Sequence, residues 1–365
     1  MSLSVGIVGS PNVGKSTLFN ALLKRQVALI ANYPFATIEP NVGIAEVPDQ
    51  RLAKLAQVIG TKVIKPATVE FVDIAGLVAG ASQGAGLGNQ FLAHIRQTDV
   101  ICHVLRAFSD PQVIREGATQ PEADLQIVRT ELQLADLMTL DKQPQPKGAA
   151  DVATKNRWQL IQNWKKWLNQ GQNILTYQPT DENQTWLQTQ LAKELCLLTA
   201  KPEILVINVD ESDLANWQSL TASWSDRLQV KSGQVIVISA QVESELSSLA
   251  TADQQQYLQG LGVEESGLER LAAVAYATLG LQSFLTAGIK EVRAWTIKQG
   301  DNAQTAAGVI HTDLAHKFIK AMVISYPDFL RWDGWKSAKD QGKVRQEGRD
   351  YLMQPDDVVE FMTGS

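Results

Sequence analysis

The stretch from Gly9 to Thr17 constrains this chain more than any other. It reads G-S-P-N-V-G-K-S-T, contains the pattern G-x-x-x-x-G-K-S, and lies between an apolar run and an apolar helical pattern. A strand, a glycine-rich loop and a helix in that order form a phosphate-binding loop. Gly9 and Gly14 let successive backbone N–H groups point at phosphate oxygens, and the helix N-terminus adds to the attraction. The sequence therefore predicts a site for a nucleoside triphosphate.

The side chains of this loop suit the same chemistry. Lys15 is placed to reach the β and γ phosphates, and the Ser16 hydroxyl is placed to bind Mg²⁺. An ordinary glycine turn between a strand and a helix is the alternative, but the strand before this loop and the helix after it are the context that a phosphate-binding loop demands. The predicted phosphate-binding residues are Asn12, Val13, Gly14, Lys15, Ser16 and Thr17.

Two further motifs supply candidate ligands for the metal and the γ-phosphate. Asp73 follows the apolar run 68–72 and stands three residues before Gly76. In this arrangement the carboxylate holds Mg²⁺ through its water shell and the glycine N–H bonds the γ-phosphate. Thr37 lies in the proline-rich loop 31–41, where a switch protein senses Mg²⁺ and the γ-phosphate, although a lone threonine also suits a turn. The predicted metal ligands are Ser16, Thr37 and Asp73, and the predicted catalytic residues are Lys15, Thr37 and Gly76.

The residue after Gly76 is Leu77. Ras-like enzymes carry a glutamine there, which orients the attacking water. Because leucine cannot hydrogen-bond water, we expect slow hydrolysis, or a water that another group or a partner positions. The glycine-rich segment 76–88 suits a loop that becomes ordered when ligand binds.

Two later strand ends lie where a G domain reads its base. Asn208-Val209-Asp210-Glu211 follows one apolar strand, and Ser239 follows another. The usual motif is N-K-x-D, whose aspartate accepts two hydrogen bonds from guanine. Glu211 is one methylene longer, so it cannot keep that geometry unless the base or the loop moves, whereas adenine has no N1 donor to lose. We predict base contacts at Asn208, Val209 and Ser239, and a preference for ATP over GTP.

Length and composition indicate a globular protein of two or three domains. The chain has 365 residues, 44% of them hydrophobic and 20% charged, and a formal net charge of −6. This charge argues against coating of nucleic acid by bulk attraction. With no signal-peptide pattern and no apolar run of membrane-spanning length, we expect a cytoplasmic protein without membrane contact. Cys102, His103 and Cys196 lie in apolar patterns and are expected to be buried.

Two regions outside the motifs have distinctive compositions. Residues 124–200 carry apolar residues at helical spacing, interrupted by the breaker 143–148, which predicts a helical insertion. Its tryptophans are expected to pack between helices rather than form an exposed binding face: Trp158, Trp164, Trp167 and Trp186. Between Arg331 and Arg349 there are six basic and three acidic residues around Trp332 and Trp335. This pattern is typical either of an RNA contact or of a solvated helix face with packed tryptophans.

Taken together, these motifs resemble the YchF subfamily of Obg-related P-loop proteins, the ribosome-binding ATPases, also called Obg-like ATPases. The resemblance extends over nearly the whole chain. The segments that carry it are the phosphate loop, 32–41, 73–88, 208–211, T-A-G-I-K-E-V-R-A-W-T at 286–296, A-G-V-I-H-T-D at 307–313 and G-K-V-R-Q-E-G-R-D-Y at 342–351.

The resemblance implies an α/β fold in three parts. These are a discontinuous P-loop nucleotide-binding G domain (1–123 and 201–280), a helical, coiled-coil-like insertion (124–200), and a C-terminal β-grasp TGS domain (281–365). The insertion is shorter and richer in tryptophan than is usual in the family.

The resemblance also implies a function. It suggests a slow ATPase that uses Mg²⁺ and associates with the ribosome or its large subunit, and it raises K⁺ binding at Asn12 as a hypothesis. Arg115 stands where family members often have a histidine proposed to assist hydrolysis, so that role is not carried over. The alternatives are an Obg-type GTPase, or a nucleotide-gated RNA- or ribosome-binding scaffold with incidental hydrolysis.

Overall fold

The computed structural model describes residues 3–30, 41–74, 87–109, 120–148, 151–179 and 182–364. The chain divides into two compact units. The first comprises Met1–Ile44 and Glu70–Arg270, and the second comprises Ala45–Val69 and Leu271–Ser365. None of the helices in the described part of the chain is both long enough and apolar enough to cross a membrane.

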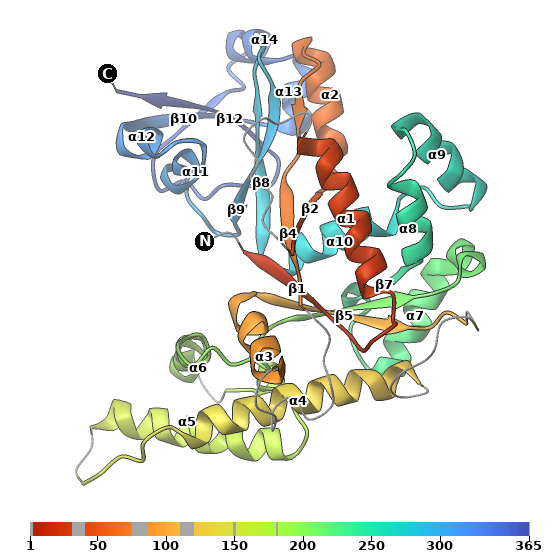
Figure 1. Ribbon diagram of the computed structural model, residues 1–365. Helices are drawn as coiled ribbons and strands as arrows, with labels where there is room; N and C mark the ends of the chain where they lie inside the picture. Colours follow the sequence, from red (N-terminus) through yellow and green to blue (C-terminus); the bar gives the residue numbers. More distant parts are fainter. Residues whose placement is uncertain are drawn as a thin grey trace. The chain divides into compact units, whose positions relative to one another are not determined.

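The first unit is organised around a mostly parallel sheet with the strand order β2-β4-β1-β5-β6-β7 (Figure 1). Four of its strands are buried at every residue: β1 (Ser4–Val8), β5 (Val100–Arg106), β6 (Glu203–Asn208) and β7 (Val235–Ile238). Parallel strands read as continuous apolar runs because crossover helices cover both faces of their sheet. β4 (Thr68–Asp73) pairs in parallel with β1, and β2 (Val42–Glu46) forms the edge. The carboxyl ends of the parallel strands β4, β1, β5, β6 and β7, where ligands bind in such folds, therefore meet at one edge.

Helices cover the two faces of this sheet. α1 (Lys15–Ile30) packs against α8 (Ala240–Leu246) on one side, whereas α3 (Leu87–Gln97) and α4 (Pro121–Asp141) lie on the other (Figure 1). α3 and α4 share an apolar cluster with β1 and β5. A second cluster joins β6 and β7 to α7 (Trp217–Leu228), α8 and α9 (Thr251–Gly260).

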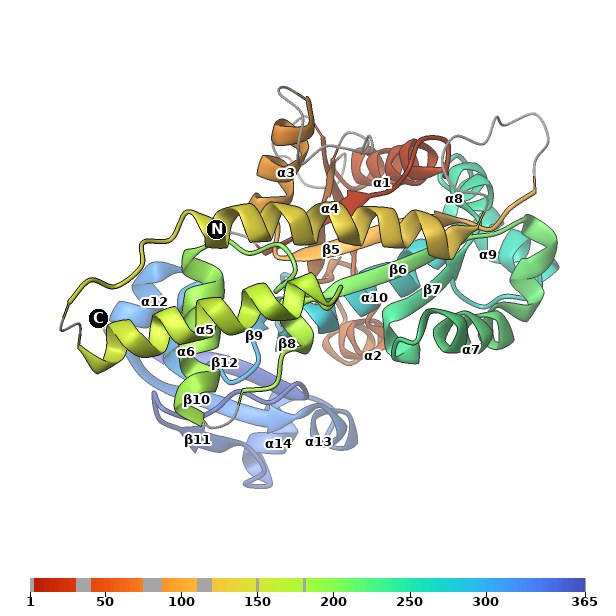
Figure 2. The ribbon, with the colours of Figure 1, turned by 90° about the horizontal axis from the view of Figure 1, so that it is seen from below.

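The helical insertion is present. Figure 2 shows α5 (Val152–Asn169) beside α4, and a smaller core joins α4, α5 and α6 (Glu182–Glu194). Asp151 begins α5 by accepting a hydrogen bond from Thr154 N at 2.7 Å. Trp164 is fully buried in this core, as expected, but Trp186 is 66% exposed. The packing prediction therefore fails at that tryptophan.

The second unit contains a mixed sheet with the strand order β11-β10-β12-β8-β9-β3. Its strands are β3 (Ile64–Lys65), β8 (Leu281–Ala287), β9 (Val292–Lys298), β10 (Phe318–Ser325), β11 (Arg345–Glu347) and β12 (Asp357–Thr363). β8 and β9 form an antiparallel pair, and β12 joins β8 in parallel. The associated helices are α2 (Gln50–Ile59), α11 (Ala303–Ile310), α12 (Thr312–His316), α13 (Tyr326–Arg331) and α14 (Trp335–Asp340). α10 (Gly267–Thr278) crosses the division between the units.

This division differs from the three parts expected from the sequence. Residues 45–69 and 271–280, assigned to the nucleotide-binding domain, belong to the second unit. β3 pairs with β9, and α2 packs against β9 and α13, which ties 45–69 to the C-terminal sheet. Residues 124–200 belong to the first unit, because α4 packs directly on β5. The TGS assignment of 281–365 stays a prediction.

The burial predicted for Cys102, His103 and Cys196 is confirmed for two of these residues and wrong for the third. Cys102 and His103 are buried in β5, but Cys196 is exposed. α6 ends at Glu194, and Cys196 follows with a left-handed φ of 49°, so the apolar helical pattern no longer governs its direction. His103 Nε2 lies 3.6 Å from Glu203 Oε1, and neither imidazole nitrogen has a hydrogen-bond partner among the described residues.

Glu203 is the centre of a buried charged group at the start of β6. Arg129 donates two hydrogen bonds to Glu203 Oε2, at 3.1 and 2.6 Å. Burial raises the pKa of the Glu203 carboxyl, but the adjacent His103 and Arg129 outweigh burial and lower this pKa to about 2. The carboxylate is therefore held ionised inside the fold.

Candidate nucleotide-binding site

The loop between β1 and α1 is built so that only glycine fits at its two ends. A β-carbon on Gly9 would lie 2.6 Å from the carbonyl oxygen of Val104 in β5. Gly14 has φ +94°, and a β-carbon there would lie 2.1 Å from Asn208 Nδ2. The backbone of the loop thus lies directly against β5 and β6, which leaves its other side to approach a ligand closely.

Lys15 begins α1 and reaches across to the end of β4. Its Nζ donates a hydrogen bond to Ile74 O at 2.7 Å and lies 3.6 Å from Asp73 Oδ1. Burial lowers the pKa of Lys15, while the charge of Asp73 raises it. An ammonium group has three donors, so the bond to Ile74 leaves capacity for phosphate oxygens. The structure brings the predicted lysine and the predicted aspartate together.

The oxygen atoms near this lysine fit a magnesium ion that arrives with a nucleotide. Asp73 Oδ1 is buried and has no hydrogen-bond partner among the described residues, and Ser16 is exposed in the first turn of α1. The described residues contain no group of three or more His, Cys, Asp and Glu that could hold a metal. Mg²⁺ is commonly bound by one or two protein oxygens together with phosphates and water. The residues thus suit a phosphate-bound Mg²⁺ better than a permanently held metal.

Asn208, the last residue of β6, connects the phosphate loop to the loop after β7. Its Nδ2 donates to Val13 O at 2.9 Å, and its Oδ1 accepts a hydrogen bond from Ala240 N at 2.9 Å. All of these atoms belong to buried residues. Ser239, also buried, is the residue that precedes α8. One side chain therefore fixes the phosphate loop relative to the predicted base-binding loop.

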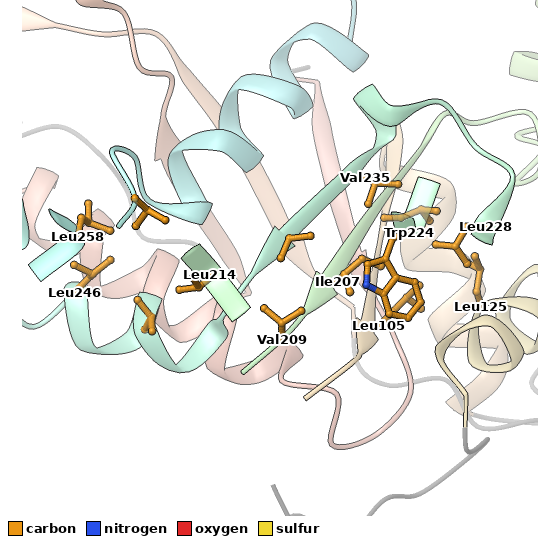
Figure 3. Packing of buried hydrophobic residues seen from close by; sticks show 14 residues of the cluster. Leu105, Leu125, Ile207, Val209, Leu214, Trp224, Leu228, Val235, Leu246 and Leu258 are labelled. Atoms are coloured by element: carbon orange, nitrogen blue, oxygen red, sulfur yellow. The ribbon is translucent and has the colours of Figure 1, made fainter. Parts of the chain in front are cut away.

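The remaining residues of the N-V-D-E motif point in different directions. Val209 is buried in the cluster that Figure 3 shows, together with Leu105 and Trp224. Asp210 Oδ2 accepts hydrogen bonds from Ser109 N at 3.1 Å and Ser109 Oγ at 2.9 Å. Glu211 is exposed where a short 3₁₀ helix begins. The side chain of Val209 thus packs in the core, while Glu211 remains accessible.

Some predicted residues cannot be placed, and some contacts were not foreseen. Thr37, Gly76, Leu77 and Arg115 lie outside the described residues. Asn12 is exposed with φ 60°, and Thr17 is exposed on α1. The sequence reasoning missed Ile74 O, the amide of Ala240 and the Asp210–Ser109 contact. The first two are backbone groups and leave no signal in the side-chain pattern, whereas a serine and an aspartate after adjacent strands could have suggested the third.

A phosphate loop after the first strand, an aspartate ending a neighbouring strand and an asparagine ending β6 define a P-loop nucleotide-binding domain of the GTPase type. Comparison with known families agrees. A family model described as 50S ribosome-binding GTPase matches residues 4–145. The YchF-GTPase_C model, described as a protein of unknown function, matches residues 281–363.

Individual relatives match over almost the full chain. "Ribosome-binding ATPase YchF" of Bacillus subtilis is 43% identical over 368 residues and covers 99% of each chain. The protein of the same name from Haemophilus influenzae is 44% identical over 371 residues, again covering 99% of each chain. The solved structure of the Schizosaccharomyces pombe YchF GTPase superposes with a TM-score of 0.85 at 33% identity, covering 99% of this chain and 98% of that chain. The chain belongs to the YchF family.

Proposed function

We propose that this chain binds ATP together with Mg²⁺, hydrolyses it slowly, and associates with the ribosome or its large subunit in the cytoplasm. The observation that carries the nucleotide part is the pairing of Lys15 with Asp73 and Ile74 beside the glycine loop. The relatives named ribosome-binding ATPases support the choice of ATP and of the ribosome. The 33% identical solved relative is named a GTPase, so the choice between adenine and guanine must be argued from the site.

The base-side contacts favour adenine. Guanine offers the acceptor O6 and the donors N1–H and N2–H₂, whereas adenine offers a donor at N6. The backbone N–H of Ala240, at the start of α8, is already donated to Asn208 Oδ1. The acid at the end of the motif is Glu211 rather than aspartate. A site without paired partners for guanine loses its discrimination for that base. Asn208, Val209 and Ser239 are the proposed base contacts; the amide of Asn208 is already bonded at both ends, so the second lone pair of its Oδ1 is the acceptor that remains.

The proposed roles in hydrolysis follow from the positions of these residues in the sequence motifs. Lys15 neutralises charge on the phosphate that is transferred, and the N–H of Gly76 bonds its oxygens. Ser16, Thr37 and Asp73 hold Mg²⁺, which supplies further charge neutralisation when bound. Leu77 offers no hydrogen bond to the attacking water, so the rate should be low without a partner.

The nucleotide choice is tested by competition of ATP and GTP against a fluorescent nucleotide. Tighter binding of ATP is expected, and equal or tighter binding of GTP would favour the Obg-type GTPase. For the hydrolysis step we expect Lys15→Ala to lose ATP turnover. Lys24→Ala is the matched control, because Lys24 lies on the same helix and donates to Ser248 Oγ instead. Turnover that survives in Lys15→Ala removes the catalytic assignment.

K⁺ binding at Asn12 is a separate hypothesis. If it holds, turnover should be faster in K⁺ than in Na⁺ buffers at equal ionic strength, and Asn12→Ala should remove the difference. Equal rates in the two buffers would exclude it.

Association with the ribosome is tested by gradient sedimentation with and without nucleotide. Association that is the same with and without nucleotide would favour the scaffold alternative.

We also propose that residues 331–349 contact RNA, and that their cations rather than their tryptophans make this contact. Trp335 Nε1 donates to Ala287 O at 2.9 Å, and its ring packs edge-on against Phe329, so this tryptophan is engaged in packing.

A further inference from the structure

A pocket of about 380 Å³ lies in the first unit, formed by the end of α3, by α6 and by the segments before β5 and β6. Asp99 and Pro202 in its wall directly precede β5 and β6, so the pocket is at the amino-terminal edge of the sheet. The phosphate loop lies at the carboxyl edge. The pocket therefore shares no residue with the nucleotide site.

The charged groups of the pocket are mostly cations. Arg96, Lys193 and Lys201 line it, against Asp99 as the single acid among the described lining residues. The Asp99 carboxylate already accepts a hydrogen bond from Ser4 N at 3.0 Å. Lys201 Nζ donates to the carbonyl oxygens that end α3, among them Ile95 O at 2.8 Å, and the charges of Asp99 and Asp136 act on it without a direct ion pair among the described residues. The pocket is therefore electropositive.

Arg96 is the most informative of these cations. It is half-buried at the end of α3, and its guanidinium makes no hydrogen bond or close ion pair with any described residue, although its charge acts on the buried carboxylate of Asp136. Arginine presents a planar fork of donors that matches a carboxylate or phosphate with two parallel hydrogen bonds. A partly buried guanidinium without such a partner is poised to accept an anion.

The rest of the lining is largely apolar. Ile174 and Leu197 are buried beneath the pocket, Ala192 lines its side, and Leu175 is 45% exposed at its edge. Ligand pockets of this kind combine an apolar lining with a few polar groups that fix orientation, and their volumes start at about 300 Å³. Gln188 adds a buried Oε1 without a hydrogen-bond partner among the described residues. This oxygen could accept from a hydroxyl group.

We propose that this pocket binds a small organic anion with an apolar body, its carboxylate or phosphate against Arg96 and its body against Ile174 and Leu197. The site is independent of the proposed nucleotide chemistry. Neither the sequence motifs nor the names of the relatives assign a ligand to it.

The chain carries its own reporter for this pocket. It has two cysteines, and Cys196 lies in the pocket wall and is exposed. Cys102 is buried in β5, and burial raises its pKa to about 12, so it reacts poorly with thiol reagents. The alkylation rate with N-ethylmaleimide, a neutral reagent, therefore follows the accessibility of Cys196.

The experiment measures protection of Cys196 in the full chain by octanoate and octyl phosphate, with octanol and octylamine as matched controls. We expect saturable protection by one or both anions, little by octanol and none by octylamine. The two anions distinguish a carboxylate head from a phosphate head. Protection by octanol equal to that of both anions, or no saturable protection by either anion, would overturn the proposal.

Two variants assign the protection to the pocket. Arg96→Gln should weaken binding of the protecting anion about tenfold, which is the low end of the range for losing a hydrogen bond to a charged group. Lys155→Gln, an exposed charge change on α5, should leave it unchanged. Ala192→Phe fills the cavity while keeping its charges and should abolish protection. Since Arg96 makes no side-chain hydrogen bond to a described residue, Arg96→Gln should fold normally by circular dichroism, and unchanged affinity in that folded variant would refute the assignment.

Discussion

Replacing Asn208 with alanine should loosen two distant loops at once. The variant removes the hydrogen bond from Nδ2 to Val13 O and the one from Ala240 N to Oδ1, each 2.9 Å long and buried. It leaves a buried carbonyl and a buried amide without partners, and each such group costs about 1–3 kcal/mol. Together they should destabilise the closed arrangement by about 2–6 kcal/mol.

Hydrogen exchange measured by mass spectrometry reports on this arrangement locally, which matters because a chain with two units need not unfold in one step. A loss of at least about 2 kcal/mol corresponds to exchange about 30-fold faster, since about 1.4 kcal/mol is a factor of ten. We expect this acceleration in peptides covering both Val13 and Ala240, and a parallel loss of ATP affinity. Asn20→Ala, an exposed change on α1, is the control.

A second variant separates the two bonds. Asn208→Asp keeps an oxygen for Ala240 N but replaces the donor to Val13 O with a second oxygen. The phosphate-loop peptide should therefore exchange faster, while the start of α8 is affected less. If Asn208→Ala accelerates neither peptide, or accelerates only one, the side chain does not couple the loops and the reasoning is wrong.

Three further predictions concern the phosphate loop, the buried Glu203 and the packing of Trp335. Gly14→Ala should abolish ATP binding because its β-carbon would meet Asn208 Nδ2. The control is Gly171→Ala, at φ +75° with no neighbour within 4 Å, which should lose only about 1–2 kcal/mol of stability through left-handed strain. Equal losses of ATP binding in the two variants would contradict the steric argument. The folded pKa of Glu203, about 2, is below its ordinary value of 4.5, so the ionised carboxylate stabilises the fold above pH 4.5 and this contribution is lost as the pH falls toward 2. Urea unfolding across this range should show about 3 kcal/mol more loss in the wild type than in Glu203→Gln, and parallel curves would refute it. Trp335→Phe should destabilise the second unit by about 1–3 kcal/mol in thermal unfolding, because Ala287 O loses its donor, and an unchanged melting temperature would show that this bond contributes nothing.

The parts of the site that lie within one short stretch could be predicted from the sequence. The phosphate loop has a residue pattern, a preceding strand and a following helix, and the structure places β1 and α1 on either side of it. Asp73 could be predicted because an apolar strand ends at that residue. Local patterns of this kind reflect local physics, so they are visible without the fold.

Contacts between distant segments could not be predicted in the same way. Asn208 bonds Val13 across 195 residues of sequence, and no local pattern encodes that distance. The two-residue strand β3 is too short to show alternation, so its pairing with β9, and with it the membership of 45–69 in the second unit, was invisible. The burial prediction for Cys196 was wrong for another reason. The apolar pattern in the sequence continues to this residue, but α6 ends at Glu194, so helical spacing no longer predicts which side chains are buried.

The base-side motif shows how one part of a site can change while another stays. Asn208 is buried and bonded at both ends of its amide, so a substitution there disturbs the phosphate loop regardless of the base. Glu211 is exposed and begins a 3₁₀ helix, so a change of acid at that position costs the fold little. The scaffold therefore constrains the asparagine through stability and leaves the acid free to vary with the nucleotide. On this argument, Glu211→Asp should shift the ratio of GTP to ATP affinity toward GTP without changing hydrogen exchange at Ala240. A shift in exchange without a shift in the ratio would show that the two positions are not separable.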